Sequence, residues 1–293
     1  MRVLNFGSLN LDHVYHVSHF PLPGETLSAA GYGVHLGGKG FNQSVAMARA
    51  GLSVCHAGCI GGDGLALREF LVDNGVDVSL LQTVAAPTGH AVIEVDQQGQ
   101  NRILLYGGAN LQVDAAYIDS VLSQFSPGDV LVLQNEISCL STLVEKAVQR
   151  GLRIVLNPSP IGPQLTPQLI AQAEYLILNE LEGGALSGQS QPLPCLRALL
   201  ARCPHSKIVL TLGEAGAFYA DEGRVLHQRA MAAEAVDTSA AGDTFTGFFL
   251  GGLFSGQPVE AALRIAAQAA AIAVSRPGAA ESIPLFGEVS AFF

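Results

Sequence analysis

The chain has 293 residues, of which 49% are hydrophobic and only 14% charged, and its formal net charge is −10. This composition excludes a disordered chain, and the acidic balance argues against a nucleic-acid-binding protein. A bound anion would therefore need local partners such as backbone amides, a metal ion or single basic side chains. The five cysteines form no CxxC pair, and no apolar run is long enough to span a membrane. We expect a cytoplasmic protein with reduced thiols and no membrane or nucleic-acid partner.

Short apolar runs alternate with helical patterns along most of the chain. The predicted strands are 2–6, 53–57, 130–134, 153–156, 175–178 and 207–212, and the predicted helices are 42–50, 65–74, 115–123, 140–150 and 193–203. Strands that alternate with helices in this way indicate a mostly parallel sheet with helices on both faces. The sequence therefore predicts an α/β protein with a three-layer α/β/α core, which we take as one domain over residues 1–293.

Two segments, at about 12–35 and 88–106, interrupt this rhythm. In the second, Ala91-Val92-Ile93-Glu94-Val95-Asp96 alternates in polarity, the chain turns at 97–101, and it returns through 102–106. Alternation of this kind is typical of a sheet with one solvated face. We expect the two segments to form a small β-sheet that projects from the core, at a place suited to a lid over a site.

The stretch Asp237-Thr238-Ser239-Ala240-Ala241-Gly242-Asp243-Thr244-Phe245 carries the clearest chemical signal. Small residues open there onto a predicted helix, whose first N–H groups have no partner within the helix and can bind an anion. A carboxylate at Asp243 would compete with that anion, unless it accepts a proton from a hydroxyl that attacks a phosphoryl group. The alternative is an ordinary first-turn Asp that is stabilised by the helix dipole.

Two further polar stretches lie near predicted strand and helix ends. Gly37-Gly38-Lys39-Gly40 precedes a helix but is not a P-loop, because Gly40 stands where GxxxxGK[ST] needs Ser or Thr. It suits a loop whose backbone approaches a hydroxylated ligand. Asn10 and Asp12 follow the first strand, at the end where open α/β sheets bind ligands, although a polar turn explains them equally well.

The two glycine-containing stretches resemble the signatures of one family. DTSAAGDTFTG is similar to the C-terminal signature DTxGAGD of the ribokinase-like sugar kinases, the PfkB family, and GGKGFNQSVA is similar to their N-terminal GGKGxNQAVA. The resemblance covers essentially the whole chain. It implies an ATP-dependent carbohydrate kinase that uses Mg²⁺ and is activated by K⁺, with a β-lid through which two copies pair as a homodimer. The acceptor it implies is the primary hydroxyl of a pentose, D-ribose, which would become D-ribose 5-phosphate.

The resemblance also assigns residues to the two substrates. Asp243 would be the base, and the amides of Ala241, Gly242 and Asp243 would hold the γ-phosphoryl group. The sugar would contact Asn10, Asp12, Gly38, Lys39, Asn42, Glu136 and Asp243. ATP would lie along Asn179, Thr211, Gly213, Gly216 and Gly242. Glu182, in the stretch matching NxxE, would hold Mg²⁺ through water, although Asn179 alone would also suit helix capping. K⁺ would be bound, mostly by backbone oxygens, at Asp237, Ser239, Ala273, Arg276, Gly278 and Ser282.

Some positions depart from the family pattern. Ala267 stands where a His or Asn often contacts adenine, and Phe41, Phe248 and Phe249 replace smaller residues beside the motifs. We expect these phenylalanines to narrow or reshape the pocket. The acceptor therefore stays open to a nucleoside, 2-deoxyribose or a fructose-type hexose, and a non-catalytic sugar or nucleotide sensor on the same fold is the alternative of a different class.

Overall fold

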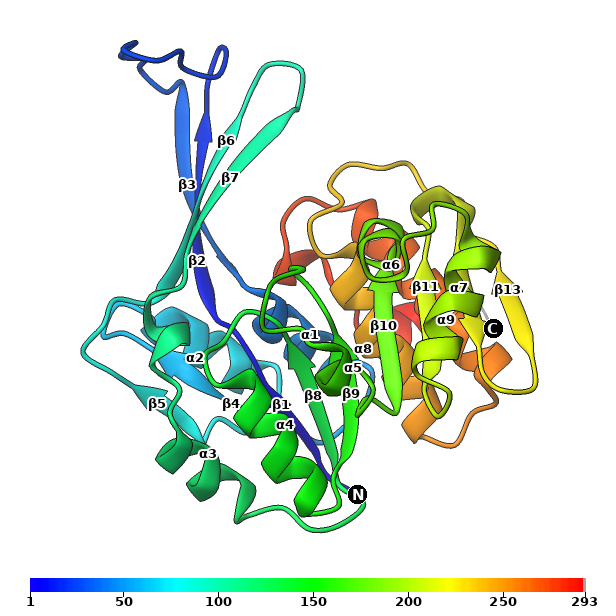
Figure 1. Ribbon diagram of the computed structural model, residues 1–293. Helices are drawn as coiled ribbons and strands as arrows, with labels where there is room; N and C mark the ends of the chain where they lie inside the picture. The colour runs from blue at the N-terminus through cyan, green and yellow to red at the C-terminus, as the bar shows by residue number, and fades with distance from the viewer. Residues whose placement is uncertain (292–293) are drawn as a thin grey trace.

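The computed structural model describes residues 1–291, and its centre is a nine-stranded sheet (Figure 1). The strand order is β13-β12-β11-β10-β9-β8-β1-β4-β5. The strands are β1 (Val3–Phe6), β4 (Val54–Ile60), β5 (Leu81–Thr83), β8 (Val130–Gln134), β9 (Arg153–Asn157), β10 (Tyr175–Asn179), β11 (Lys207–Thr211), β12 (Ala217–Ala220) and β13 (Val225–Gln228). The strands from β5 to β11 run parallel, and β12 and β13 extend the sheet antiparallel.

Successive residues of each central strand point into two different cores, one on each face of the sheet. In β8, for example, Val130 and Val132 belong to one cluster, and Leu131 and Leu133 belong to the other. A strand that is buried on both faces reads as a continuous apolar run rather than an alternating one. This is why the sequence predicted these strands correctly.

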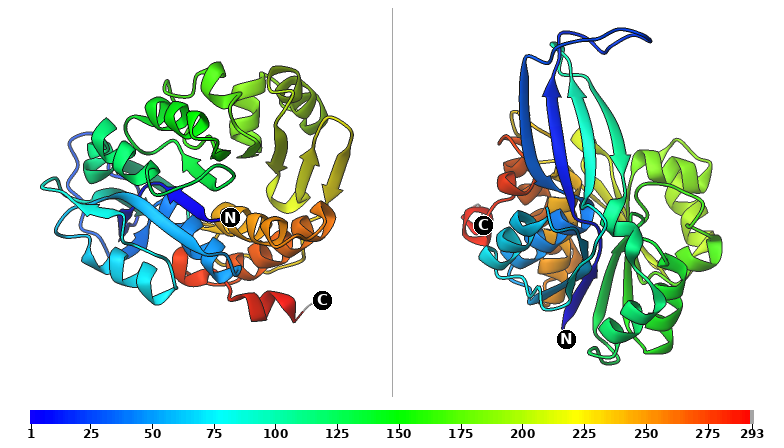
Figure 2. Two further views of the ribbon diagram at one scale, coloured as in Figure 1. Left: turned by 90° about the horizontal axis from the view of Figure 1, so that it is seen from below. Right: turned by 90° about the vertical axis from the view of Figure 1, so that its left-hand side faces the viewer.

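Helices cover both faces of this sheet, as Figure 2 shows from below. One face carries α1 (Lys39–Arg49), α2 (Leu65–Asp73), α8 (Ala241–Phe254) and α9 (Val259–Val274); the other carries α3 (Ala115–Leu122), α4 (Leu140–Gln149), α5 (Pro167–Ile170), α6 (Glu180–Ser187) and α7 (Pro192–Arg202). Short 3₁₀ turns at Gly108–Gln112, Gly213–Ala215 and Ala280–Ser282 and helix α10 (Phe286–Ser290) complete the described elements. The predicted three-layer α/β/α fold is confirmed.

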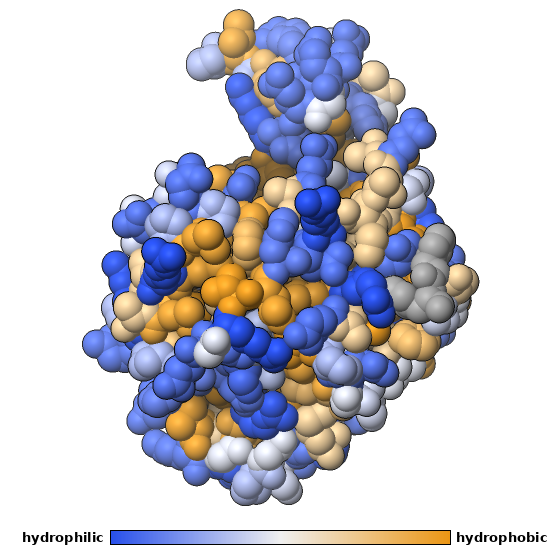
Figure 3. Space-filling view, turned by 90° about the vertical axis from the view of Figure 1, so that its right-hand side faces the viewer, coloured by the Kyte–Doolittle hydropathy of each residue, from blue (hydrophilic) through white to orange (hydrophobic). Residues whose placement is uncertain are grey.

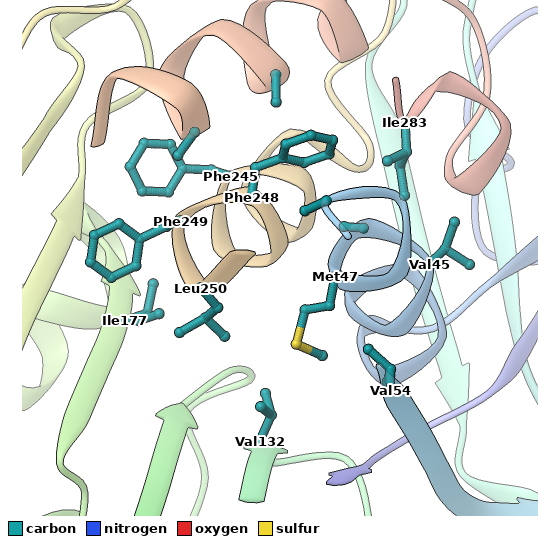
Figure 4. Close-up of a cluster of buried hydrophobic side chains, with 14 of the residues drawn as sticks. Val45, Met47, Val54, Val132, Ile177, Phe245, Phe248, Phe249, Leu250 and Ile283 are labelled. Atoms are coloured by element: carbon teal, nitrogen blue, oxygen red, sulfur yellow. The ribbon is translucent and has the colours of Figure 1, made fainter. Parts of the chain in front are cut away.

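Helices α1 and α8 carry the two sequence motifs, and they pack closely against each other. A Cβ atom on Gly247 would lie 2.3 Å from Cβ of Ala46, so this glycine permits the approach. Phe248 and Phe249 lie in the core beside residues such as Met47 and Ile177 (Figure 4). Phe41 is also fully buried, with its ring 5.5 Å from that of Phe70. The expectation that these phenylalanines reshape the pocket is therefore wrong: they fill the core behind it.

A second, four-stranded sheet rises from the upper edge of the core as a separate projection (Figure 1). Its order is β3-β2-β6-β7, formed by β3 (Gly31–Gly37), β2 (Asn10–His16), β6 (Gly89–Val95) and β7 (Asn101–Tyr106). We call it the small sheet. Along β7 every residue is exposed, including Ile103 and Leu104. The small sheet that the alternating segments predicted is thus present, and its first strand starts at Asn10, two residues before the predicted segment.

Three strands of the core were not predicted from the sequence. β5 has three residues, and β12 and β13 have four each. Such short strands, at the sheet's edges or next to one, give little periodicity to detect. No described helix is long and apolar enough to cross a membrane.

Candidate active site

The parallel strands of the core end at one edge of the sheet, and the predicted site residues gather there. β1 leads into Ser8 and Asn10, β8 leads into Glu136, and β10 ends at Asn179. The small sheet rises from this same edge. The carboxyl ends of parallel strands are the usual place for a ligand in open α/β folds, because the chain must leave the sheet there and opens a crevice.

The start of helix α8 provides amide donors at this edge. The N–H of Ala241 donates to the carbonyl of Thr238 at 3.2 Å, whereas the N–H groups of Gly242 and Asp243 bond to no atom of residues 1–291. A Cβ atom on Gly242 would meet nothing within 4 Å, so this backbone is open to a ligand. Free N–H groups at the positive end of a 14-residue helix form an anion-binding site.

Asp243 lies in the first turn of α8 and is 7% exposed. Its carboxylate accepts hydrogen bonds from Nδ2 of Asn42 at 3.1 Å and from Nε2 of Gln43 at 2.9 Å. Burial raises its pKa above the ordinary value, while the nearby Lys39 ammonium and the two amide donors act in the opposite direction. A carboxylate that is buried and held by neutral donors is suited to act as a base.

Lys39, Glu136 and Asp12 surround the space beside Asp243. Burial works to lower the pKa of Lys39, but the field of Asp243, Glu136 and Glu182 outweighs it and raises that pKa. Glu136 accepts hydrogen bonds from the Ser8 hydroxyl and, at 3.3 Å, from the backbone N–H of Lys39. Lys39 itself forms no direct ion pair with the described carboxylates, so its ammonium can donate to a ligand.

Burial and the repulsion of Glu136 raise the pKa of Asp12 to about 6. Asp12 lies on strand β2, so the small sheet carries part of this site. Asn10 lies on the same strand and is 4% exposed. The structure therefore brings the seven predicted sugar-contact residues together, with Gly38 at φ +96° close to the backbone of Ser8 and Asn10.

Two polar residues that support this site escaped the sequence analysis. Asn110 pairs with the backbone N–H and C=O of Leu9 and donates to Oδ1 of Asn10 at 2.9 Å, which fixes the amide of Asn10. Gln43 holds Asp243, as described above. Neither gives a signal of its own, because its partner is 100 or more residues away in the chain.

A cavity of about 290 Å³ lies on the other side of the α8 N-terminus. It is lined by Thr211, Gly213, Gly216, Ala241 and Gly242 of the predicted set, and by Glu214, Ala230, Met231, Ala233, Ala235, Thr238, Phe245, Ala267, Ala270, Ala271 and Val274. Figure 3, which views the side that carries β13 and α9, shows apolar side chains gathered below the small sheet. Such walls suit the flat, largely apolar base of a nucleotide.

Gly216 keeps the wall of this cavity in place. Its φ is +92°, and a Cβ atom there would lie 2.1 Å from the carbonyl oxygen of Gln228. The segment 229–238 carries five of the lining residues, and its alanines gave no signal in the sequence. Ala267 lines the cavity, as the resemblance implied for that position, and its methyl group would offer a base no hydrogen bond.

Asn179 and Glu182 lie outside the residues that line the cavity. They form a capping box at the start of α6, in which Oδ1 of Asn179 accepts from the N–H of Glu182 at 2.9 Å and Oε2 of Glu182 accepts from the N–H of Asn179 at 3.0 Å. The capping interpretation of Asn179 is therefore confirmed. Oε1 of Glu182 stays free of protein partners in residues 1–291, and Glu182 is close enough to raise the pKa of Asp243.

The predicted cation residues come from two loops that meet behind the N-terminus of α8. Asp237 accepts from the N–H and hydroxyl of Ser239, at 2.9 and 2.5 Å, and from the N–H of Gly278 at 3.0 Å. Arg276 pairs with Glu288 at 2.5 Å, and its N–H donates to the carbonyl of Ala273. The hydroxyl of Ser282 donates to the carbonyl of Ala279. The two loops are joined through Asp237.

Comparison with known proteins now identifies the family. The model of the pfkB family of carbohydrate kinases matches residues 2–285. This chain belongs to that family. Ribokinase of Schizosaccharomyces pombe is 35% identical over 312 aligned residues, which cover 100% of this chain and 98% of that protein.

Solved structures of this family agree with the fold described here. The crystal structure of ribokinase from Thermotoga maritima matches with a TM-score of 0.90 and 35% identity, over 100% of this chain and 99% of that one. Arabidopsis thaliana ribokinase complexed with ribose and ATP matches with a TM-score of 0.88 and 28% identity, over 99% and 97%. This family member is therefore an ATP-dependent carbohydrate kinase.

Proposed function

We propose that this protein is a ribokinase, which transfers the γ-phosphoryl group of ATP to O5 of D-ribose. The observation that carries the proposal is the juxtaposition at the start of α8: a buried carboxylate, Asp243, beside free amides that face a cavity. Phosphoryl transfer asks the protein mainly for alignment and for stabilisation of charge, and these are the two properties of this site.

In the proposed reaction, the O5 hydroxyl gives its proton to the carboxylate of Asp243 as O5 forms a bond to the γ-phosphorus. The bond between that phosphorus and the bridging oxygen breaks, and ADP leaves with the electron pair. The amides of Gly242 and Asp243 face the charge that develops on the phosphoryl oxygens. Lys39 lies among three carboxylates and balances the negative charge of the assembled site.

Asn10, Asp12, Gly38, Lys39, Asn42 and Glu136 are the proposed sugar contacts. Asp12 offers two acceptors to neighbouring hydroxyls, and Asn10 and Asn42 each offer a donor and an acceptor. Oδ1 of Asn42 is buried and has no hydrogen-bond partner within the described residues. A sugar hydroxyl would satisfy this atom, which supports a hydroxylated ligand at this place.

The chemistry of the donor set fits Mg²⁺ and K⁺. Glu182, with one free carboxylate oxygen, would hold Mg²⁺ through water, and the metal would neutralise charge on the phosphates. K⁺ would lie between the loops at Asp237, Ser239, Ala273, Arg276, Gly278 and Ser282, bound mainly by carbonyls. Asn179 would face the phosphates from the start of α6.

The small sheet would close over the sugar as a lid, and it would pair with its copy in a homodimer. The support is its position above the site and its exposed apolar residues, among them Tyr32, Leu104 and Tyr106. Free thiols and the use of ATP suit a protein that works in the cytoplasm.

The deciding experiment measures ADP release from MgATP with D-ribose, with and without K⁺, beside a panel of other pentoses, hexoses and nucleosides. We expect strong dependence on ribose, enhanced by K⁺, with the phosphate on O5. Activity with another acceptor alone would overturn the sugar assignment and keep the phosphoryl chemistry. No turnover with any acceptor would overturn the proposal and favour a sensor.

A further inference from the structure

Beneath Asp243 lies a buried chain of side-chain amides that the proposed sugar and nucleotide contacts do not use. Gln43 is fully buried on α1, and its Nε2 donates both to Oδ1 of Asp243, at 2.9 Å, and to Oδ1 of Asn157, at 3.2 Å. Asn157 in turn donates to the carbonyl of Ile177 at 2.9 Å. Gln43 is thus tied to two strands of the core as well as to the carboxylate.

The orientation of the Gln43 amide is fixed from behind. Its Oε1 accepts from Nε2 of Gln134 at 2.7 Å, and Gln134 also donates to Oδ1 of Asn5 at 3.1 Å. Nδ2 of Asn5 donates hydrogen bonds to the carbonyl of Gly40 and the hydroxyl of Ser44. Because the backbone carbonyl of Gly40 fixes Asn5 and the oxygen of Asn5 fixes the NH₂ of Gln134, a flipped Gln43 amide would place its NH₂ against the donor of Gln134. The donor face of Gln43 therefore points to Asp243.

We propose that Gln43 is the positioning residue of the phosphoryl transfer: it fixes the plane of the Asp243 carboxylate and keeps that carboxylate ionised in a buried site. This inference rests on the proposed function of Asp243 as base. It explains why a neutral amide stands at this position: a cation would hold the proton-accepting oxygen too tightly, and an apolar side chain would leave the buried charge without a donor.

The electrostatic surroundings agree with this role. Burial raises the pKa of Asp243, Glu182 adds to that effect, and the donors Gln43 and Asn42 oppose it together with the charge of Lys39. Burial and, to a smaller extent, the charge of Asp243 raise the pKa of Glu136. The far end of the amide chain is His56, whose Nδ1 bonds to Ser44 at 2.7 Å and whose pKa is lowered to about 4 by burial. His56 thus stays neutral near pH 7.

The test replaces Gln43 by Met, which keeps the shape and removes the donor. We expect kcat to fall roughly 10- to 100-fold and the acidic limb of the kcat–pH profile to move about one unit upward, because the carboxylate loses a hydrogen bond that favours its ionised form. Gln43→Glu supplies a donor only when its own carboxyl is protonated. Its kcat relative to that of Gln43→Met should therefore rise as the pH falls.

Ser44→Ala is the matched control, since Ser44 is buried in the same network and does not touch Asp243. It should lower the melting temperature and leave the pH profile in place. A Gln43→Met enzyme with an unshifted profile would overturn the inference, whereas inactivity of the unmodified enzyme with all acceptors would overturn the proposed function instead. If Gln43→Met does not fold, Gln134→Met frees Oε1 of Gln43 and should shift the profile in the same direction by less; no shift would again count against the inference.

Discussion

The proposed nucleotide half and the proposed sugar half of the site are built by different means. The cavity proposed for the nucleotide is lined mainly by alanines and glycines, with Glu214 as the lone carboxylate among its lining residues. The sugar half gathers Asp12, Lys39, Glu136 and Asp243, whose charges shift one another's pKa values.

The difference separates two kinds of selectivity. Shape and backbone donors hold a nucleotide at a wide range of pH, because they do not titrate. Buried carboxylates hold hydroxyls only while they are ionised, so binding of the sugar and the chemistry should depend on pH. Changes in the first half should alter the use of ATP, and changes in the second should alter turnover and pH dependence.

The largest effect is expected for Asp243→Asn. Loss of the base should lower kcat about 10²- to 10⁴-fold. The Kd for ATP should stay the same, because the substitution changes neither the amides at the start of α8 nor the cavity. Kinetics of ADP release and calorimetric titration with ATP measure the two quantities. Asp119→Asn, at an exposed ion pair with Lys146, is the control and should retain full activity.

The stability of Asp243→Asn gives an independent check. The pKa of Asp243 is raised in the folded protein, so its ionised form opposes folding at neutral pH. Removal of the charge should leave the melting temperature unchanged or higher. A variant that has lost activity through unfolding would instead melt at a lower temperature. If Asp243→Asn turned over as fast as the unmodified enzyme, Asp243 would not be the base.

Substitutions at two glycines of α8 distinguish an effect on the proposed nucleotide site from an effect on packing of the core. Gly242→Ala adds a methyl group where nothing lies within 4 Å beyond the adjoining residues and the backbone of its own helix, so it should fold normally and obstruct the phosphates. We expect kcat/KM for ATP to fall roughly 10- to 100-fold. Gly247→Ala would place its Cβ 2.3 Å from Cβ of Ala46 and should cost about 1–3 kcal/mol of stability.

Melting curves and steady-state kinetics of both variants distinguish these effects. Gly247→Ala should lose stability while its folded fraction keeps the normal KM for ATP. If Gly242→Ala instead bound and used ATP normally, the phosphate site would not lie at these amides.

The core strands and the small sheet were predictable from the sequence because burial leaves a pattern in neighbouring residues. Residues Val130–Leu133 are apolar and point into the cores on both faces, and the polarity of residues 91–96 alternates, so the sequence of each segment reflects its environment. The candidate site was predictable where its residues stand in a motif, as Asp243 and Lys39 do.

Two parts of the site could not be predicted. One wall of the cavity proposed for the nucleotide consists of loop alanines such as Ala230 and Ala233, whose small side chains form no recognisable sequence pattern. Gln43 lies inside the N-terminal motif GGKGFNQSVA, but its proposed role depends on a contact with Asp243, 200 residues away, which no local pattern encodes. The prediction for the three buried phenylalanines was wrong because a residue next to a motif in the sequence can point away from the site.

The smallest effect is expected for the pH dependence of sugar binding at Asp12. Its pKa is raised to about 6, first by burial and then by Glu136, so it is largely protonated at pH 5 and loses acceptors for the hydroxyls. The Kd for ribose should therefore rise about 10-fold between pH 7 and pH 5. The Kd for ATP, measured by the same titration, should change less.

Asp12→Asn should bind ribose weakly at pH 7 and lose most of this pH dependence. Because ionised Asp12 opposes folding above about pH 6 and the penalty disappears as the pH falls towards 4, the substitution should also raise the melting temperature at pH 7. Glu94→Gln is the matched control, since Glu94 pairs with Tyr15 on the small sheet, three residues beyond the partner of Asp12 and on the opposite face. Equal pH dependence in Asp12→Asn and Glu94→Gln would show that another carboxyl, with Glu136 the nearest candidate, governs sugar binding.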